Sequence, residues 1–489
     1  MAKQTRKRVQ GGTTNGGTGG GVLPGGGAME QGTTGRFLVL LKEDAISEGA
    51  KMLEEKVGLQ VARSADFTAG VLSAEAAGAD SVVFDEIGVA VVRGDPDLHR
   101  ATLAAAGEDS PLSIVEPERI VYALAEQPAG GSLLPADIPF SLPPVIEQPV
   151  APVLTAEAPA APALITTEYL LGYRDAIDGL LRHLRGGEAG AEAYREPAAG
   201  ARIVSEAQAT WGLQATRVLE SKFSGKDVKV AVLDTGFDTR HPDFAGRQIT
   251  TASFVPGQAV QDGNGHGTHC IGTALGARQP GILPRYGIAF GGRIFAGKVL
   301  SNQGSGADGW ILAGINWAIA NGCRVVSMSL GAPVQPGQPF SQIFETVARR
   351  ALAKGTLIVA AAGNESDRRV GRFEPVGHPA NCPSILAVAA VDVNLRIAFF
   401  SNRGLNPMGG QVDIAAPGVD VYSSWPMPTR YRRLQGTSMA TPHVAGIAAL
   451  FVEASPKASA SDIWRLITQG ARRLPLPSSD VGAGLVQAP

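Results

Sequence analysis

The stretch VKVAVLDTG, residues 228–236, decides the fold class. Its first six residues form a near-continuous apolar run, which is typical of a strand buried on both faces of a parallel sheet. The run ends in Asp234, and a turn follows. Ligands of open α/β sheets bind at the carboxyl ends of such strands, so we expect Asp234 to lie at a functional site.

Helical and strand patterns alternate from about residue 210 to the end of the chain. The apolar spacing predicts helices over 309–322, 340–355, 438–455 and 460–472, and strands over 323–330, 356–363 and 384–391. Alternation of this kind is typical of a parallel sheet with covering helices. The predicted fold class is therefore α/β, with a central, mostly parallel sheet flanked by helices.

Three further segments precede this domain. Residues 1–35 are rich in Gly and Thr and are predicted to be a flexible tail. Residues 36–124 show strand and helix patterns that suggest a small α/β-sandwich. Residues 125–205 form a Pro/Ala-rich linker, within which 167–187 has helical spacing. The last domain is assigned to residues 206–489.

Charge is distributed unevenly between these segments. The 489-residue chain has a net charge of −2, which gives no reason to expect nucleic acid or an anionic membrane as partner. Residues 36–124, however, carry 16 acidic and 8 basic side chains. An acidic segment that docks on a more basic domain would explain this difference.

The sequence contains neither a disulfide framework nor a membrane span. Its three cysteines, Cys270, Cys323 and Cys382, cannot all pair within one chain. No apolar run approaches the roughly 20 residues that a membrane helix needs. The basic N-terminus leads into glycine rather than an apolar stretch, so no conventional secretion signal is visible. We expect a cytoplasmic protein or one exported by a leaderless route.

Reactive side chains stand at three element boundaries near glycines. Asp234 ends its strand, His266 opens a helix in DGNGHGTHC (262–270), and Ser438 lies at a helix N-terminus in GTSMATPHVAG (436–446). Serine is a weak nucleophile until a base takes its proton, and a histidine base works best when a carboxylate holds its tautomer. Together the three residues supply the parts of a nucleophilic hydrolase.

These segments resemble those of the subtilisin-like serine proteases, the subtilases. The resemblance covers about 210–489 and rests on VAVLDTGFDTRHPDF, DGNGHGTHC, SMSLG, AAGNES and GTSMATPHVAG, in that order. DGNGHGTHC is most similar to the proteinase K branch. Ser438 in GTSMA, rather than in a G-x-S-x-G elbow, and the order Asp–His–Ser count against an α/β-hydrolase.

The resemblance implies an endopeptidase that needs no cofactor for catalysis. Asp234 would orient His266, His266 would act as general base and then acid, and Ser438 would attack the scissile carbonyl. Asn364 in AAGNES matches the family's oxyanion residue, which would act with the backbone N–H of Ser438. Proteins or peptides are the implied substrates.

Substrate-contacting segments also carry over. Two segments would pair with extended substrate backbone, and a third group would form the wall and floor of the main specificity pocket. The first two are Gly304, Ser305, Gly306 and Ser329, Leu330, Gly331; the third is Ala361, Ala362, Gly363 and Gly377. A glycine at the pocket floor leaves room for a large apolar side chain.

Residues 36–124 resemble the inhibitor-type propeptide of this family, which assists folding and then plugs the active site. VEPERIVYAL (115–124) resembles its end and suggests self-cleavage between Leu124 and Ala125. The long segment 125–205 departs from the family pattern, so cleavage could instead fall within it. The expected product is a monomer that its own propeptide inhibits.

A structural calcium ion is a weaker expectation. Asp243 in HPDF matches a family calcium ligand. The loop that supplies the partner oxygens reads ARQPGILPRYG (277–287) and lacks the usual asparagine, so the oxygen cage is incomplete. Asp243 is therefore a candidate calcium ligand by this match alone, and no other metal ligand is assigned.

Two alternatives from other functional classes remain. A catalytically silent subtilase fold could act as a binding protein, and labelling by a serine-reactive fluorophosphonate would distinguish it from an enzyme. A zinc site could use His266, His269 and Cys270, although the sequence offers no further ligand to complete the set. We favour His269 as a packed helix residue and Cys270 as a free thiol behind the active site.

Overall fold

The structure is a computed structural model, and it describes residues 32–67, 78–94, 96–107, 109–124 and 205–489. Residues 1–31 of the predicted tail lie outside the described residues. The same holds for Ala125 and for the linker and its predicted helix up to residue 204. Within the described ranges, no helix is both long and apolar enough to cross a membrane.

The N-terminal unit is a sheet covered on one face by helices. Its strands run in the order β5-β1-β4-β3-β2. Their bounds are β1 Thr33–Leu41, β2 Val61–Arg63, β3 Ser81–Phe84, β4 Val89–Val92 and β5 Leu112–Ala123. The helices are α1 Ile46–Met52, continued by the π-helix η2 Leu53–Val57, and α3 Pro96–Ala105. This arrangement agrees with the α/β-sandwich expected for 36–124.

Strand β1 is apolar at consecutive positions because both of its faces are buried. Phe37, Val39 and Leu41 pack in the cluster that includes Leu53 beneath the unit's own helices. Leu38 and Leu40 alternate with them and pack instead in the core of the larger domain. Successive side chains of a strand point to opposite faces, so this sheet is buried on both.

The larger domain is built on seven parallel strands in the order β14-β13-β12-β10-β6-β8-β7. These are β6 Lys229–Asp234, β7 Ile249–Ser253, β8 Arg293–Lys298, β10 Val325–Met328, β12 Leu357–Ala361, β13 Leu386–Val391 and β14 Ile414–Pro417. A separate hairpin pairs β15 Val421–Ser424 with β16 Tyr431–Leu434. The predicted α/β fold with a central parallel sheet is confirmed.

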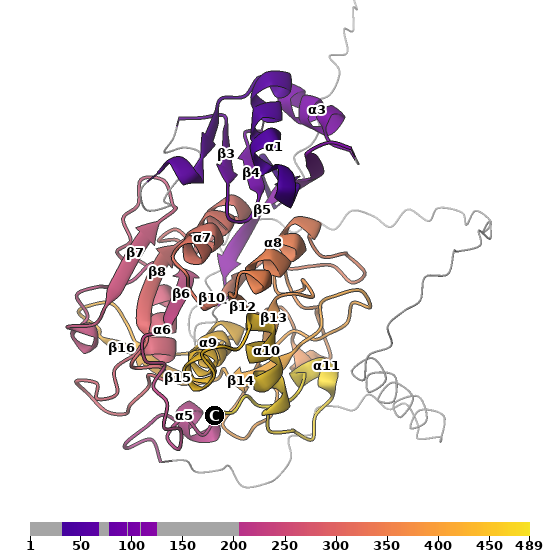
Figure 1. Cartoon of the computed structure of the whole chain (residues 1–489). Coiled ribbons are helices and arrows are strands. Elements are labelled where there is room, and N and C mark those ends of the chain that lie inside the picture. Colours follow the sequence, from indigo (N-terminus) through magenta and orange to yellow (C-terminus); the bar gives the residue numbers. More distant parts are fainter. Residues whose placement is uncertain (1–31, 68–77, 95, 108, 125–204) are drawn as a thin grey trace, which may run out of the picture.

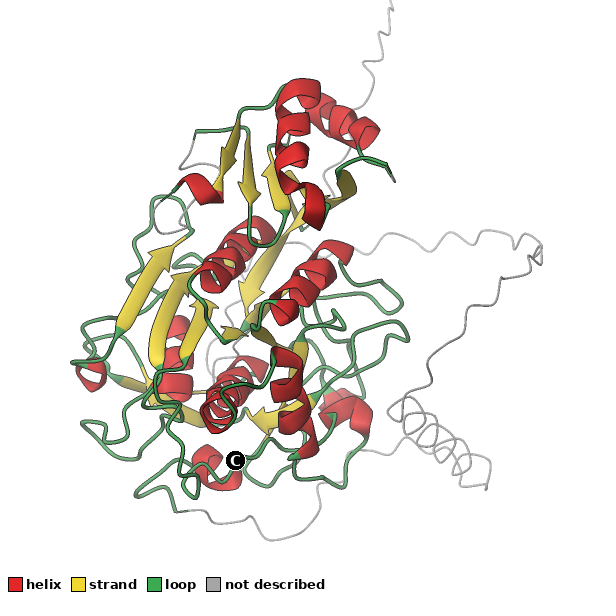
Figure 2. Ribbon diagram, in the orientation of Figure 1, coloured by secondary structure: helices red, strands yellow, loops and turns green. Residues whose placement is uncertain are grey.

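Helices cover both faces of this sheet (Figure 2). They are α5 Trp211–Ala215, α6 His266–Leu275, α7 Asp308–Ala320, α8 Gln342–Ala353, α9 Thr437–Ala454, α10 Ala460–Gln469 and α11 Ser478–Val481. Ala231 and Leu233 of β6 pack in the cluster that contains α7 and α8. Val230 and Val232 pack in the cluster that contains α6 and α9, so β6 is the fully buried strand that its sequence predicts.

Strand β5 joins the two parts of the molecule (Figure 1). Its first half pairs with β1, and its last residues enter the larger domain. There it lies between two short strands, β9 Ser305–Ala307 and β11 Leu330–Gly331, and pairs antiparallel with both. The end of the N-terminal unit is thereby brought to the carboxyl edge of the parallel sheet.

Candidate active site

Asp234 and His266 form a buried hydrogen-bonded pair. Asp234 is the last residue of β6, and His266 is the first residue of α6. His266 Nδ1 lies 2.7 Å from Asp234 Oδ1, and the two residues are 2% and 1% exposed. A carboxylate only accepts hydrogen bonds, so Nδ1 carries the proton. This tautomer leaves Nε2 as the acceptor, and Nε2 has no hydrogen-bond partner among the described residues.

The charge of Asp234 shapes the titration of His266. Burial alone lowers the pKa of His266, but the Asp234 carboxylate and the Cys270 thiol outweigh it and raise the pKa well above its ordinary value. The raised pKa reflects the stabilisation of a charged imidazolium by the adjacent carboxylate.

Gly265 allows the helix of His266 to begin at this point. Its φ is +108°, a conformation that side chains with a Cβ rarely adopt. A Cβ on Gly265 would also lie 2.3 Å from the Trp425 ring. The glycines of DGNGHGTHC thus have a steric reason: they bring the start of α6 close to its neighbours and hold His266 beside Asp234.

Ser438 lies in the first turn of α9, fully buried in this state. Its Oγ donates to the Ser329 carbonyl oxygen over 3.0 Å rather than to His266. The Cys270 thiol approaches from behind, with Sγ 3.6 Å from the Ser438 carbonyl oxygen and 3.9 Å from His266 Nδ1. Cys270 thus lies beside both His266 and the Ser438 backbone, while the Ser438 hydroxyl is hydrogen-bonded to Ser329.

Asn364 holds the carbonyl group at the end of the N-terminal unit. Its Nδ2 donates to the Leu124 oxygen over 2.6 Å. The other half of the amide is fixed, because Oδ1 accepts from the backbone N–H and the hydroxyl of Thr437 at 2.9 and 2.8 Å. Thr437 immediately precedes Ser438, so the donor that Asn364 presents is positioned relative to the serine.

Both predicted backbone-pairing segments contact the end of β5. Gly331 pairs with Tyr122 and Leu330 with Ala123, while Gly306 and Ser305 pair with Val121 and Tyr122. The ladder continues past the strands, because Ala123 donates to the Gly304 oxygen at 2.8 Å and Leu124 to the Ser329 oxygen at 3.3 Å. All six residues of the two segments therefore lie beside residues 120–124.

Three of the predicted pocket residues lie at the end of β12 or directly after it, and the fourth, Gly377, is hydrogen-bonded to one of them. Ala361 ends β12, and Ala362 and Gly377 are joined by a 2.9 Å backbone hydrogen bond. Gly331 is closely packed between the end of β5 and the segment after Gly377. A Cβ on Gly331 would lie 3.1 Å from the Leu124 side chain and 2.7 Å from the His378 oxygen. Gly363 has a φ of +112°, so it directs the chain from β12 toward Asn364.

The structure separates His269 from the two residues with which it could form a zinc site. Its Nε2 lies 3.0 and 3.1 Å from the carbonyl oxygens of Val421 and Arg432, so it donates to the hairpin β15–β16. Burial, followed by nearby His266, lowers the pKa of His269 to about 3. The His/Cys/Asp/Glu group that converges in the described ranges is instead Asp234, His266 and Cys270, with ligand atoms within 4.8 Å of one another.

Two glutamates of β5 reach the starts of helices in the larger domain. Glu118, fully buried, accepts from the Gly309 backbone N–H in α7 at 2.9 Å. Glu116 accepts from the Ser341 hydroxyl and from the Gln342 N–H at the start of α8. Carboxylates at helix N-termini accept from N–H groups that have no partner within the helix, and their negative charge interacts favourably with the positive end of the helix dipole. The alternation in VEPER could have indicated two glutamates on one face, but only the fold shows what they touch.

Arg350 of α8 reaches in the opposite direction. It is 8% exposed, and its guanidinium donates to three carbonyl oxygens of the N-terminal unit. They are those of Ile87 at 2.6 Å, Gly88 at 3.3 Å and Leu41 at 2.9 Å. The charge difference between the segments suggested docking, but no local pattern distinguishes Arg350 from its neighbour Arg349.

The Asp243 carboxylate accepts hydrogen bonds from two tyrosine hydroxyls and one backbone N–H. The Tyr286 hydroxyl donates at 2.6 Å, the Tyr431 hydroxyl at 3.0 Å and the Gly281 N–H at 2.8 Å. Burial and the Asp243 carboxylate raise the pKa of both tyrosines, so their hydroxyls stay protonated. Gly281 and Tyr286 belong to the loop that was expected to supply calcium ligands.

The domain that carries this site has known relatives. The model of the subtilase family matches residues 225–484. Subtilisin DY of Bacillus licheniformis is 40% identical over 264 residues, which span 54% of this chain and 90% of that protein. Subtilisin E of Bacillus subtilis is 43% identical over 237 residues, 48% of this chain and 58% of its own length. Subtilisin BL of Lederbergia lenta is 41% identical over 283 residues, 57% and 96% respectively.

Proposed function

Because the chain belongs to the subtilase family and is a serine-type endopeptidase, we propose that Ser438 is its nucleophile and His266 its general base. Asp234 is the carboxylate that orients the base. The 2.7 Å bond between Asp234 Oδ1 and His266 Nδ1 supports these roles, because it leaves Nε2 to accept a proton. Protein chains are the substrates.

The bond between Leu124 and Ala125 is proposed as the one that the enzyme cuts in its own chain. The observation that carries this proposal is the 2.6 Å hydrogen bond from Asn364 Nδ2 to the Leu124 carbonyl oxygen. That oxygen becomes negatively charged when a nucleophile adds to the carbonyl, and a fixed donor stabilises the charge. The backbone N–H of Ser438 is the proposed second donor.

The reaction then follows from the groups present. His266 Nε2 takes the proton of Ser438 Oγ, which attacks the Leu124 carbonyl carbon and forms a tetrahedral intermediate. The intermediate collapses as His266 returns that proton to the amine of Ala125, which leaves. Water hydrolyses the remaining ester between Leu124 and Ser438. Before the first step, Ser438 Oγ has to leave the Ser329 carbonyl, to which it donates at 3.0 Å, and turn toward His266.

Replacement of Ser438 tests this assignment, together with N-terminal sequencing of the matured wild-type chain. The new first residue is expected to be Ala125. A first residue elsewhere in 126–205 would place the self-cleavage in the linker and leave Leu124 as an inhibitory contact only. A chain that matures without Ser438 would contradict the proposed nucleophile.

The N-terminal unit is proposed to remain bound after the cut and to inhibit the enzyme. Strand β5 fills the place of a substrate between β9 and β11, and Glu116, Glu118 and Arg350 tie the unit to α7 and α8. We propose that the zymogen is a monomer. We also propose, from the sequence DGNGHGTHC alone, that this segment is related to the proteinase K branch.

Arg350→Ala is expected to shorten the latent period between self-cleavage and the appearance of activity. A hydrogen bond from a charged group is worth roughly 1.5–3 kcal/mol, so loss of this anchor should weaken inhibition by about 10- to 100-fold. The measurement is the time course of peptide hydrolysis after the precursor has been cut. Arg349→Ala is the matched control, because Arg349 is the exposed neighbour in the same helix. Equal latency in the two variants would contradict an anchoring role for Arg350.

We further propose that the two tyrosines hold Asp243 in place of calcium. A calcium ion needs about six to eight oxygen atoms that turn lone pairs toward it. Tyr286, Tyr431 and Gly281 instead direct protons at the carboxylate. The residues present therefore do not fit the ion. The loop before β8 is fastened by hydrogen bonds instead.

Tyr286→Phe is expected to lower the free energy of unfolding by about 1–3 kcal/mol, since a buried carboxylate loses one donor. A chelator is expected to leave the thermal midpoint unchanged. Both are measured by thermal unfolding in the Ser438→Ala background, which prevents self-digestion. Tyr422→Phe is the control, because Tyr422 stacks on Tyr431 but does not donate to Asp243. Stabilisation by calcium that disappears in Asp243→Asn would show that Asp243 binds the ion.

A further inference from the structure

Asp308 is a fully buried carboxylate at the end of the substrate-like strand pairing, and the proposed reaction does not use it. It is the first residue of α7, directly after β9. Its Oδ1 lies 3.0 Å from His378 Nε2, which must therefore carry the proton. His378 is itself 3% exposed, so Asp308 is held in position from within the larger domain.

The other oxygen of Asp308 faces the N-terminal unit. Oδ2 accepts from the Arg119 backbone N–H at 3.1 Å and lies 3.9 Å from the Arg119 guanidinium. Ile120, the next residue, pairs with Ala307, the last residue of β9. β9 ends at Ala307, so its backbone does not pair with Arg119. The Asp308 carboxylate accepts the Arg119 backbone N–H instead and thus continues the β5–β9 ladder by one position.

The register fixes which residue Asp308 contacts. With Leu124 counted as the first residue before the cut, Arg119 is the sixth. Its guanidinium Nη1 is buried and has no hydrogen-bond partner among the described residues. The nearest carboxylates to this atom are those of Asp308 and Glu116, at 3.9 and 3.8 Å. Glu116 belongs to β5 itself, so only Asp308 would stay with the enzyme when another chain takes this place.

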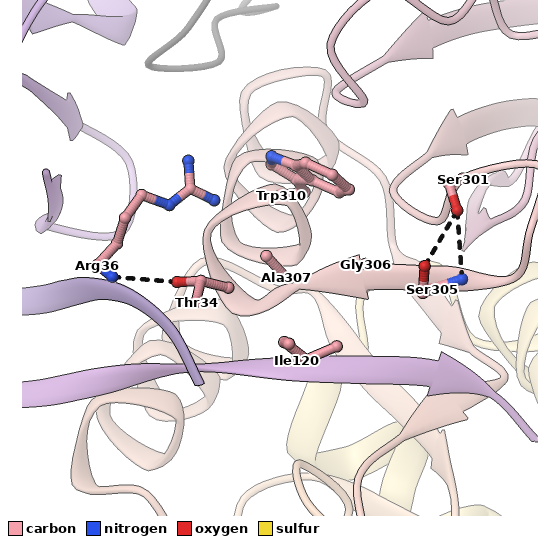
Figure 3. Close-up of a pocket in the computed structure, with 8 residues that line it drawn as sticks. All are labelled: Thr34, Arg36, Ile120, Ser301, Ser305, Gly306, Ala307 and Trp310. Atoms are coloured by element: carbon pink, nitrogen blue, oxygen red, sulfur yellow. Dashed lines mark hydrogen bonds between the residues drawn. The ribbon is translucent and has the colours of Figure 1, made fainter. Parts of the chain in front are cut away.

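The fifth position is enclosed differently. Ile120 borders a cavity of about 420 Å³ that Ala307 and Trp310 also line (Figure 3). The opposite side of this cavity is formed by Thr34 and Arg36 of β1, which belong to the N-terminal unit. A substrate would not bring that side with it. The larger domain therefore provides a fixed, charged contact at the sixth position but only part of an enclosure at the fifth.

We propose that Asp308 forms a subsite that selects a cationic side chain, arginine or lysine, six residues before the bond that is cut in substrates. One oxygen of Asp308 binds the backbone N–H at that position, and its charge attracts the side chain. This inference rests on the proposed function, because the position is counted from the Leu124–Ala125 bond. Asp308 acts in specificity, and the chemical step remains with Ser438, His266 and Asp234.

The test uses matured enzyme and peptides copied from the chain itself. The parent peptide is PERIVYALAEQP, residues 117–128, and in two others the residue at position 119 is Gln or Glu. For the wild-type enzyme, kcat/KM is expected to be about 3- to 10-fold higher with Arg than with Gln, and lowest with Glu, as for a partly screened ion pair. Asp308→Asn is expected to bring the Arg/Gln ratio close to 1.

The ratio separates specificity from a structural role. Loss of the hydrogen bond to the peptide backbone, or a less stable α7, would slow all three peptides alike and leave the ratio unchanged. Asp227→Asn is the matched control. Asp227 is an exposed aspartate just before the amino end of β6, at the other end of that strand from Asp234, and it pairs with Arg293. Its Arg/Gln ratio is expected to equal that of the wild type.

Each outcome supports or overturns the proposal. Equal rates for Arg and Gln in the wild type, or a preference that survives in Asp308→Asn, would overturn it. If Asp308→Asn does not fold, the wild type still decides: a peptide with Lys at position 119 should also be cut faster than the Gln peptide, because a carboxylate attracts either cation. Equal rates for Lys and Gln would count against the carboxylate. Failure to cut any peptide between Leu and Ala would instead contradict the proposed cleavage register.

Discussion

Ser438→Ala is expected to produce a chain that stays uncut and inactive. Removal of the nucleophile leaves His266 with no proton to take, and in a bacterial subtilisin the corresponding loss in kcat is about 10⁶-fold. Purified variant protein should therefore retain its full length on denaturing gels, whereas the wild type should separate into an N-terminal unit and a peptidase. A fluorophosphonate should label matured wild-type protein at Ser438 and leave the variant unlabelled.

Two further samples make this result specific. Ser455→Ala removes a hydroxyl at the other end of the same helix and is expected to mature as the wild type does. A trace of active wild type added to Ser438→Ala shows whether the bond can also be cut by a second molecule. If pure Ser438→Ala matures on its own at the same position, both the nucleophile and self-cleavage are wrong.

Asn364→Ala is expected to lower kcat by about 10²- to 10³-fold, with a smaller change in KM, because its amide stabilises charge that develops only in the transition state. The range is the one measured for loss of the matching donor in a subtilisin. Self-cleavage should slow by a similar factor, since Asn364 Nδ2 contacts the Leu124 oxygen in the uncut chain. Peptide kinetics and the half-time of precursor cleavage measure the two effects separately.

Asn364→Asp distinguishes the donor from the anchor. An aspartate keeps an oxygen that can accept from the Thr437 N–H and hydroxyl, but it replaces the donor with a negative charge. It should therefore be at least as slow as Asn364→Ala while the start of α9 stays in place. A variant with aspartate that retains nearly full kcat would show that Asn364 acts on Thr437 rather than on the oxyanion.

The sequence by itself determined the fold class and named the reactive side chains. Runs such as VKVAVL and TLIVAAAG are apolar at consecutive positions because both faces of their strands are buried, and this signal is local. Glycine within two residues of Asp234, His266 and Ser438 is likewise a local signal of tight approach. Whether these residues act as proposed stays a prediction, but their place at element boundaries needed no tertiary information.

Only the tertiary structure decided which distant groups meet. Asn364 reaches Leu124, Arg350 reaches Gly88, and Asp308 reaches Arg119 across separations of 240, 262 and 189 residues. Hydrophobic periodicity describes which face of an element is buried and carries no information about which partner covers it. The tyrosines around Asp243 show the same limit, since the loop pattern predicted an incomplete set of calcium ligands but not the hydroxyls that donate to Asp243. Contacts of this kind depend on how elements pack in three dimensions, and the proposed preference for a cationic residue rests on one of them.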